Sequence, residues 1–334
     1  MIETDIAIIG AGPTGLFAVF EAGLLKMKCH LIDSLPQPGG QLNEIYPKKP
    51  IYDIPGFPSV LAAELTDNLM KQIAPFHPTF TLGERTESLE KQADNRWKLT
   101  TSRGSEIVAH VVVIAAGLGS FEPRKPDISN LEKFEDNGVE YIIREPEMYK
   151  GKKVVISGGG DSALDWTVIL AELTSELTLV HRRTQFRGAP DSVYKVMNLV
   201  KKSKVQLVTE AEVKFLNGNG KLESVTILHD HSGEIHKKAD HFIPLFGLSP
   251  KLGPIAEWGI ELEGNDIKVN TLDYGTNLPG VYAIGDINTY PGKLKLILCG
   301  FHEATLMCQS AFKYIYPDKK LSFKYTTVTG IHAI

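Results

Sequence analysis

Two glycine-rich loops, each joining a strand-like segment to a helix-like segment, constrain the fold of this chain more than any other feature. The first loop, residues 10–15, follows the apolar run 5–9 and precedes a helical pattern at residues 16–25. A second apolar run, residues 28–32, then ends at Asp33. This order of strand, helix and strand is typical of a βαβ unit that binds a dinucleotide.

Each glycine of the first loop has a separate physical task. We expect Gly10 to allow the tight turn, Gly12 to let the backbone approach a pyrophosphate, and Gly15 to let the helix pack closely on the strand. The start of the helix offers free N–H groups to the phosphates. Asp33 is placed to accept hydrogen bonds from a ribose. A glycine triplet alone also arises in ordinary turns, so the assignment depends on strand, helix and acid occurring together.

The same pattern occurs a second time. Residues 153–157 form an apolar run that leads into Gly158, Gly160 and Ala163, and a helical pattern and a further apolar run at 177–180 follow. Ala163 stands where the third glycine would be, which the pattern tolerates because the residue is small.

The two units differ where the second strand ends. The position equivalent to Asp33 is occupied by His181, and Arg182, Arg183 and Arg187 follow it. Guanidinium groups bind a 2′-phosphate with charge-assisted hydrogen bonds, whereas a carboxylate would repel it. The sequence therefore predicts NADP(H) in the second unit and a nucleotide with free ribose hydroxyls in the first. A solvated basic loop is the alternative reading of these arginines.

The remaining segments predict how the two units are connected. A strand–turn–strand segment follows each unit, at residues 96–116 and 222–246, and proline-containing crossovers lie at 121–126 and 248–250. We expect an α/β chain with two Rossmann-like domains of three layers (ββα). Residues 1–117 and 248–334 would form a discontinuous first domain, with residues 118–247 inserted as the second.

Composition excludes several other classes of protein. The 334 residues carry 36 Lys and Arg against 40 Asp and Glu, a net charge of −4 that argues against nucleic-acid binding. Cys29, Cys299 and Cys308 lack the two-residue spacing of a dithiol or a zinc knuckle, and three thiolates are fewer than the four that an iron–sulfur cluster normally needs. No apolar run approaches the roughly 20 residues needed to cross a membrane. The acidic first residues do not resemble a signal peptide. We expect a cytoplasmic protein without a metal.

These motifs resemble the two-dinucleotide-binding flavoproteins, and among them the low-molecular-weight thioredoxin reductases. The matching segments follow the family's order over nearly the whole chain: both glycine loops and residues 39–42, 54–57, 181–183 and 280–286. The resemblance implies FAD in the first domain and NADPH in the second. It also implies that Asp286 holds the ribityl chain of FAD, although by itself this aspartate could equally cap a helix.

One departure from the thioredoxin reductases bears directly on function. Those enzymes carry a Cys-x-x-Cys pair before the second glycine loop, but residues 141–149 contain no cysteine here, and Cys299 and Cys308 lie elsewhere. Electron relay through that dithiol is therefore excluded. The chain is more similar to the thioredoxin-reductase-like ferredoxin–NADP⁺ reductases, which lack the dithiol. The segments that carry this similarity are residues 44–47, 52–53, 116–125, 159–163 and 324–327.

This closer resemblance implies further contacts with FAD. An aromatic ring stacks on each face of the flavin in that family, and the matching residues are Tyr46 and Tyr325, the latter from the partner subunit of a homodimer. Tyr325 would have to move to admit the nicotinamide. The further residues that match FAD contacts are Gln41, Thr86 (through its backbone), Phe121 and Thr327. The resemblance implies no acid–base residue, and a surface or interface aromatic is the alternative reading of both tyrosines.

The expected activity is electron transfer between NADPH and ferredoxin or flavodoxin. FAD converts a hydride's two electrons into single-electron steps, and the helix that begins near residue 300 could stabilise the reduced flavin with its positive end. Basic residues expected to steer an acidic partner are Lys48, Lys49, Arg124, Lys125, Lys293 and Lys295. Two alternatives are an NADPH-dependent diaphorase or oxidase with another acceptor, and a non-catalytic redox sensor that binds FAD and NADPH.

Overall fold

The computed structural model describes residues 1–334 except 120–121, 129, 136, 250, 322–329 and 331–334. The chain divides into two compact units. The first unit comprises Met1–Ser120 and Pro250–Ile334, and the second comprises Phe121–Ser249. The second unit is thus an insertion in the sequence of the first.

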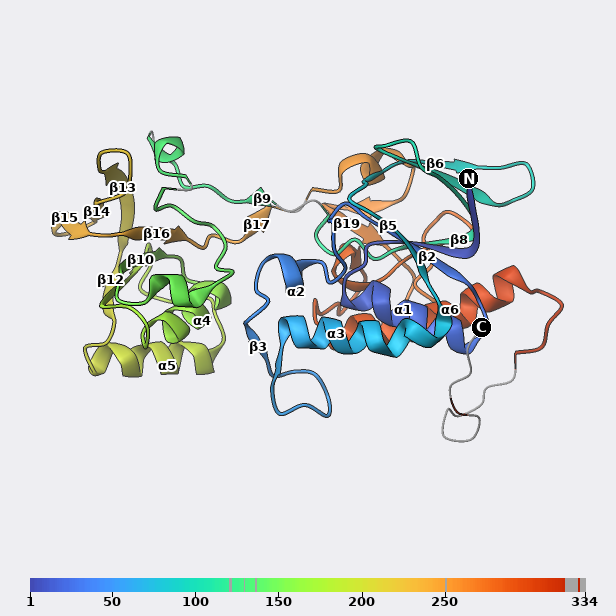
Figure 1. Cartoon of the computed structure of the whole chain (residues 1–334), viewed down its shortest axis with the longest axis horizontal. Helices are drawn as coiled ribbons and strands as arrows, with labels where there is room; N and C mark the ends of the chain where they lie inside the picture. The colour runs from blue at the N-terminus through green and yellow to red at the C-terminus, as the bar shows by residue number, and fades with distance from the viewer. Residues whose placement is uncertain (120–121, 129, 136, 250, 322–329, 331–334) are drawn as a thin grey trace. The chain divides into compact units, whose positions relative to one another are not determined.

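A seven-stranded sheet forms the centre of the first unit (Figure 1). Six strands lie in the order β5-β2-β1-β8-β7-β6, and β20 pairs with β8 as well. The helices and strands of this unit are β1 (Ile2–Ile9), α1 (Pro13–Leu24), β2 (Cys29–Asp33), α2 (Gln41–Glu44), β3 (Pro50–Ile51), β4 (Val60–Leu61), α3 (Ala62–Ile73), η1 (Ala74–Phe76), β5 (Thr79–Leu82), β6 (Thr86–Lys91), β7 (Trp97–Thr101), β8 (Glu106–Ile114), η4 (Gly253–Glu257), β18 (Leu262–Glu263), β19 (Asp266–Lys268), β20 (Val281–Ala283), η5 (Gly285–Ile287), β21 (Asn288–Thr289) and α6 (Ile297–Ile315).

Strand β8 connects the distant parts of this unit. One edge of β8 pairs with parallel β1, while the other edge pairs first with antiparallel β7 and then, from Val112 to Ile114, with parallel β20. Its last residues are apolar and fully buried, as expected for a parallel strand covered on both faces. The carboxyl ends of β1, β8 and β20 therefore meet at one edge of the sheet. Loops that follow parallel strands at such an edge commonly bind ligands.

The sheet of the first unit is covered on both faces. Helix α1 packs against α3 and α6 over one face (Figure 1), and Leu16, Val19 and Met307 belong to the core between them. A second core on the other face joins Trp97 and Leu99 of β7 to Ile267 of β19. The βαβ unit behind the first glycine loop is therefore packed on both faces of its sheet.

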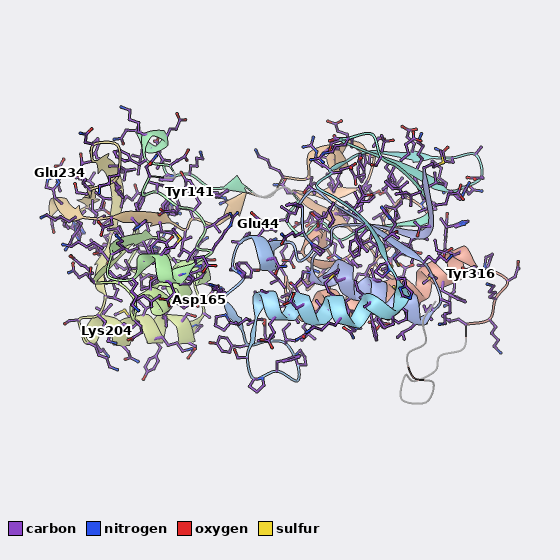
Figure 2. All side chains as sticks on the ribbon, in the orientation of Figure 1. Glu44, Tyr141, Asp165, Lys204, Glu234 and Tyr316 are labelled. Carbon is purple, nitrogen blue, oxygen red and sulfur yellow. The ribbon has the colours of Figure 1, made fainter. Side chains whose placement is uncertain are left out.

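The second unit combines a parallel sheet, β12-β11-β10-β16, with a separate antiparallel sheet, β13-β14-β15. Apolar residues of both sheets, among them Phe242 and Ile227, form one core. Ser192 of α5 donates a hydrogen bond of 2.9 Å to Asp165 of α4, which is labelled in Figure 2. The elements of this unit are β9 (Glu122–Pro123), η2 (Leu131–Lys133), η3 (Pro146–Tyr149), β10 (Lys153–Ser157), α4 (Asp161–Leu170), β11 (Glu176–His181), α5 (Pro190–Lys201), β12 (Gln206–Thr209), β13 (Ala211–Asn217), β14 (Ser224–His229), β15 (Gly233–Lys238), β16 (His241–Pro244) and β17 (Leu248–Ser249).

The strand pairing expected within residues 222–246 is wrong. Strand β14 pairs with β15 in a hairpin, whereas β16 joins the parallel sheet beside β10. The sequence of β15, Gly233–Lys238, is polar because this strand lies at the edge of its sheet with mostly exposed side chains. The sequence of β15 therefore gives no apolar signal.

Within the part of the chain that the structure describes, no helix is both long and apolar enough to span a membrane.

Candidate functional site

The first glycine loop leaves open space in front of the start of α1. Gly10 has a φ of +107°, and a Cβ there would lie 2.3 Å from the carbonyl oxygen of Ala115. A Cβ at Gly15 would lie 2.1 Å from the carbonyl oxygen of Gly10, whereas one at Gly12 would meet no atom within 4 Å. Packing of the protein itself therefore requires Gly10 and Gly15. The space at Gly12 suits a phosphate, which the N–H groups of the helix start would bind.

Asp33 lies beside this loop at the end of β2. Its carboxylate accepts hydrogen bonds from the N–H groups of Ala11, at 2.7 Å, and Leu35, at 2.9 Å. Burial raises the pKa of Asp33 above its ordinary value, although these backbone hydrogen bonds oppose the shift. A backbone hydrogen bond from Ser34 also acts on this carboxylate. Because a carboxylate has about four acceptor sites, one remains for a further donor such as a ribose hydroxyl.

Gln41 and Thr86 also lie near the first glycine loop. The N–H of Gly39 donates to the carbonyl of Ala11 at 2.8 Å, which places α2, and Gln41 as its first residue, against the loop. Thr86 follows a segment in which the N–H of Glu84 donates to the carbonyl of Asp33 at 3.0 Å. The Thr86 hydroxyl is buried without a hydrogen-bond partner among the described residues.

Tyr46 and Asp286 share one electrostatic environment. Burial and the negative charges of Asp286 and Asp53 raise the pKa of Tyr46 to about 12. Burial also raises the pKa of Asp286, and the charges of Lys293 and Lys295 oppose this shift. The Asp286 carboxylate is half-buried and hydrogen-bonds to no described residue, so its acceptors are available to a hydroxyl-bearing ligand. Together with the open loop at Gly12, this set of groups fits a dinucleotide such as FAD.

Three residues expected to contact FAD, Phe121, Tyr325 and Thr327, lie outside the described residues. Stacking by Tyr325 and its movement stay predictions for the same reason.

The second glycine loop repeats the geometry of the first. A Cβ at Gly158 would lie 2.7 Å from both the Cβ of Ala163 and the carbonyl oxygen of Leu245, whereas one at Gly160 would meet no atom within 4 Å. Gly160 directly precedes α4, as Gly12 precedes α1. Ala163 is fully buried. This loop therefore also offers a helix start with open space for a phosphate.

The segment after β11 folds back onto this second loop. The ring of His181 is buried, stacks on Phe186 at 4.8 Å between centroids, and would be 2.0 Å from a Cβ at Gly159. The N–H of Arg187 donates to the carbonyl of Gly159 at 2.8 Å. Positive charge thus gathers beside the loop.

Three arginines supply this charge. They are exposed, and none forms an ion pair with a carboxylate of the described residues: Arg182, Arg183 and Arg187. Uncompensated guanidinium groups at this position fit the 2′-phosphate of NADP(H).

Three of the lysines expected to steer a partner form ion pairs. Lys293 is buried, with 6% of its side chain exposed, and forms an ion pair with Glu303. The prediction of Lys293 as a surface steering charge is therefore wrong. Lys295 pairs with Asp266 at 2.9 Å, and Lys125 pairs with Glu135 at 2.6 Å.

Glu303 is a residue that sequence reasoning missed. It is fully buried on α6, which begins at Ile297, and it hydrogen-bonds to the segment that contains Asp286. The sequence did offer a signal for it, because Glu303 is an acidic residue between Gly300 and Ala304 on the apolar face of a helix, where an acid is unusual.

The described residues contain no group of three His, Cys, Asp or Glu side chains arranged to hold a metal ion. All three cysteines are free thiols, and Cys29 and Cys308 are buried.

Comparison with known proteins identifies the family. Residues 4–304 match the pyridine nucleotide-disulphide oxidoreductases. Ferredoxin–NADP reductase 1 of Christiangramia forsetii is 67% identical, covering 99% of this chain and 95% of its own length. The Ferredoxin–NADP reductase of Flavobacterium johnsoniae is 63% identical with the same coverage of 99% and 95%.

The fold is also that of solved thioredoxin reductases. Those of Lactococcus lactis and T. acidophilum superpose with a TM-score of 0.81 at 23% and 22% identity, covering 94% of this chain and 99% of theirs. The chain therefore belongs to the pyridine nucleotide-disulphide oxidoreductase family and, within it, to the thioredoxin-reductase-like ferredoxin–NADP reductases.

Proposed function

We propose that this protein transfers electrons between NADPH and ferredoxin by means of bound FAD. The observation that carries the proposal is the presence of two open glycine loops with opposite charges beside them. Asp33 lies beside the first loop, and exposed arginines lie beside the second. Bound FAD would supply the conversion between the two-electron chemistry of NADPH and the one-electron chemistry of an iron–sulfur carrier.

The residues proposed to hold each cofactor follow from the two loops and from the family resemblance. FAD is assigned to residues 1–117 and 248–334 and NADPH to residues 118–247. The proposed FAD contacts are Gly10, Gly12, Gly15, Asp33, Gln41, Tyr46, Thr86, Phe121, Asp286 and Thr327, with Tyr46 and Tyr325 stacking on the flavin. The proposed NADPH contacts are Gly158, Gly160, Ala163, Arg182, Arg183 and Arg187.

The protein's own groups bind and orient the cofactors in this proposal, and none acts as an acid or a base. The phenol of Tyr46 stays protonated well above neutral pH, because its pKa is raised to about 12. A neutral ring of this kind can pack on a flavin without adding charge to it. Electrons would pass from the flavin to the external carrier without a dithiol relay, since the Cys-x-x-Cys pair of the thioredoxin reductases is missing from residues 141–149.

The relatives' names support ferredoxin as the partner of this chain. Flavodoxin, which is also a small acidic one-electron carrier, is proposed as an alternative partner. A homodimer is proposed because the resemblance assigns Tyr325 to the flavin site of the other subunit. A cytoplasmic location is proposed because all three cysteines are free thiols.

Two measurements on the purified protein test this function. Under anaerobic conditions, NADPH should bleach the flavin absorbance much faster than NADH does. NADPH-driven reduction of cytochrome c should then depend on added ferredoxin. Equal rates with and without ferredoxin would instead indicate a diaphorase, and direct reduction of thioredoxin would contradict the proposal.

A further inference from the structure

The carboxylate of Glu303 is the centre of a buried polar network in the first unit. Its side chain has no exposed surface. One carboxylate oxygen accepts from the N–H of Gly285 at 2.7 Å and from the side-chain amide of Asn288 at 2.8 Å. The other accepts from the hydroxyl of Tyr290 at 2.9 Å and from the ammonium group of Lys293. Glu303 is therefore fully paired.

Lys293 completes a clamp around a single residue. Its ammonium group donates to the carbonyl oxygen of Gly285 at 2.9 Å as well as to Glu303. The N–H and the C=O of Gly285 are thus held by the two members of one buried ion pair. Gly285 has a φ of +77°, and Asp286 is the next residue in the chain. These bonds consequently fix the two peptide groups on either side of Gly285, the second of which leads directly into Asp286.

Stability of the fold does not by itself account for this arrangement. A buried ion pair usually stabilises a protein no more than apolar residues of similar volume would, because both charges lose their hydration. Removal of one partner is costly, since the other charge is then left buried and unpaired. Both members of this pair bind Gly285 instead, the first residue of the turn Gly285–Ile287, and the Asp286 carboxylate of this turn has no hydrogen-bond partner among the described residues.

We propose that Lys293 and Glu303 are positioning residues, which hold the turn Gly285–Ile287 so that the Asp286 carboxylate binds the hydroxyl-bearing chain of a flavin nucleotide. This inference rests on FAD binding to the first unit, as proposed above. The charge of Lys293 also opposes the effect of burial on the pKa of Asp286, which favours the ionised carboxylate as a hydrogen-bond acceptor.

Four variants of the full-length holoenzyme separate positioning from charge and from stability: Lys293→Met, Glu303→Gln, the double variant, and Lys295→Met as a matched control. The positive charge of Lys295 also acts on the Asp286 carboxylate, as that of Lys293 does, but its ammonium group donates to Asp266 rather than to Gly285. FAD dissociation is measured by the rise of flavin fluorescence on dilution. Thermal unfolding of the same chains stripped of FAD reports stability independently of the cofactor.

Lys293→Met should raise the dissociation constant of FAD about tenfold or more, the size expected for losing a charged hydrogen bond that holds the site. Lys295→Met should change it less than about threefold, as a paired surface charge does. Each single variant at the buried pair should lower the unfolding temperature. The double variant should recover most of the lost unfolding temperature, because no charge is left unpaired. Its dissociation constant for FAD should still be about tenfold higher than that of the wild type.

The inference is overturned if the double variant binds FAD as the wild type does, or if Lys293→Met and Lys295→Met weaken FAD equally. A double variant that fails to fold would show that the pair serves stability, which also overturns it. A wild-type protein that binds no FAD would contradict the proposed function itself, so the two failures are distinguishable.

Discussion

A single methyl group at Gly12 should separate cofactor binding from folding. The backbone at Gly12 has φ −74° and ψ 179°, which any L-residue adopts, and a Cβ there would meet no protein atom within 4 Å. Gly12 is the N-cap of α1, where alanine is less favourable than glycine. We therefore expect Gly12→Ala to change the free energy of unfolding by less than about 1 kcal/mol.

The effect of the same methyl group on FAD should be much larger. It would occupy the space in front of the helix start where the pyrophosphate is proposed to bind. Loss of one charge-assisted hydrogen bond from a backbone N–H to a phosphate costs about 1.5–3 kcal/mol. This corresponds to roughly a 10- to 150-fold higher dissociation constant for FAD.

Gly15→Ala is the matched contrast within the same loop. A Cβ at Gly15 would lie 2.1 Å from the carbonyl oxygen of Gly10, and a neighbouring backbone atom cannot yield as a flexible side chain does. Overpacking of this kind typically costs about 1–3 kcal/mol. Gly15→Ala should therefore lower the unfolding temperature even when FAD is absent.

Thermal unfolding of the FAD-free chains and FAD titration by flavin fluorescence test both expectations. The FAD-free Gly12→Ala variant should have the same unfolding temperature as the wild type but should bind FAD weakly. The FAD-free Gly15→Ala variant should have a lower unfolding temperature than the wild type. The reasoning is refuted if Gly12→Ala binds FAD normally, or if it destabilises the FAD-free chain as much as Gly15→Ala does.

Three further predictions concern the second nucleotide and pH. The double variant Arg182→Ala, Arg183→Ala should lower kcat/KM for NADPH by roughly 30- to 1000-fold and leave kcat/KM for NADH unchanged. The control Lys204→Met removes a cation that pairs with Glu172 at 2.6 Å and should change neither value of kcat/KM. An equal loss of kcat/KM for NADH in the double variant would contradict the assignment. Gly160→Ala should weaken NADPH binding without releasing FAD, as calorimetry with the holoenzyme can measure. Burial raises the pKa of Asp286 in the folded chain, so ionisation of this carboxyl lowers the stability of the fold as the pH rises. Asp286→Asn should therefore stabilise the FAD-free chain at pH 7 but not at about pH 3, where the carboxyl is protonated in the wild type as well. Equal melting temperatures of the variant and the wild type at pH 7 would refute this.

The parts of the fold that the sequence predicted are those with strong local patterns. Strands β1 and β10, with the glycine loops after them, combine apolar runs with residues that only a tight turn requires. Strands such as β15 escaped prediction because an edge strand exposes most of its side chains and needs no apolar run. The pairing of β16 with β10 could not be predicted, since pairing depends on contacts distant in the chain.

The candidate site shows the same division. The positions of Asp33 and Arg182 next to the glycine loops could be predicted from the sequence, because a βαβ unit places the end of its second strand beside its glycine loop. Lys293 was misassigned for the opposite reason. A lysine in a polar stretch is usually exposed, and only its contact with Glu303 shows that it is buried.

The amino-acid sequence alone determined that this chain has two glycine loops, one followed by a carboxylate and the other by arginines, and that it lacks the Cys-x-x-Cys pair of the thioredoxin reductases. These features depend on residue type at short spacing. The tertiary structure alone decided which glycines serve packing and which leave space for a ligand. It also decided that β20 places Asp286 at the same sheet edge as the first glycine loop, and that Glu303 and Lys293 hold the adjoining turn. Such relations depend on how strands, turns and helices pack in three dimensions, whether the residues are 8 apart in the chain, as Lys293 and Gly285 are, or far apart, as β20 and β8 are.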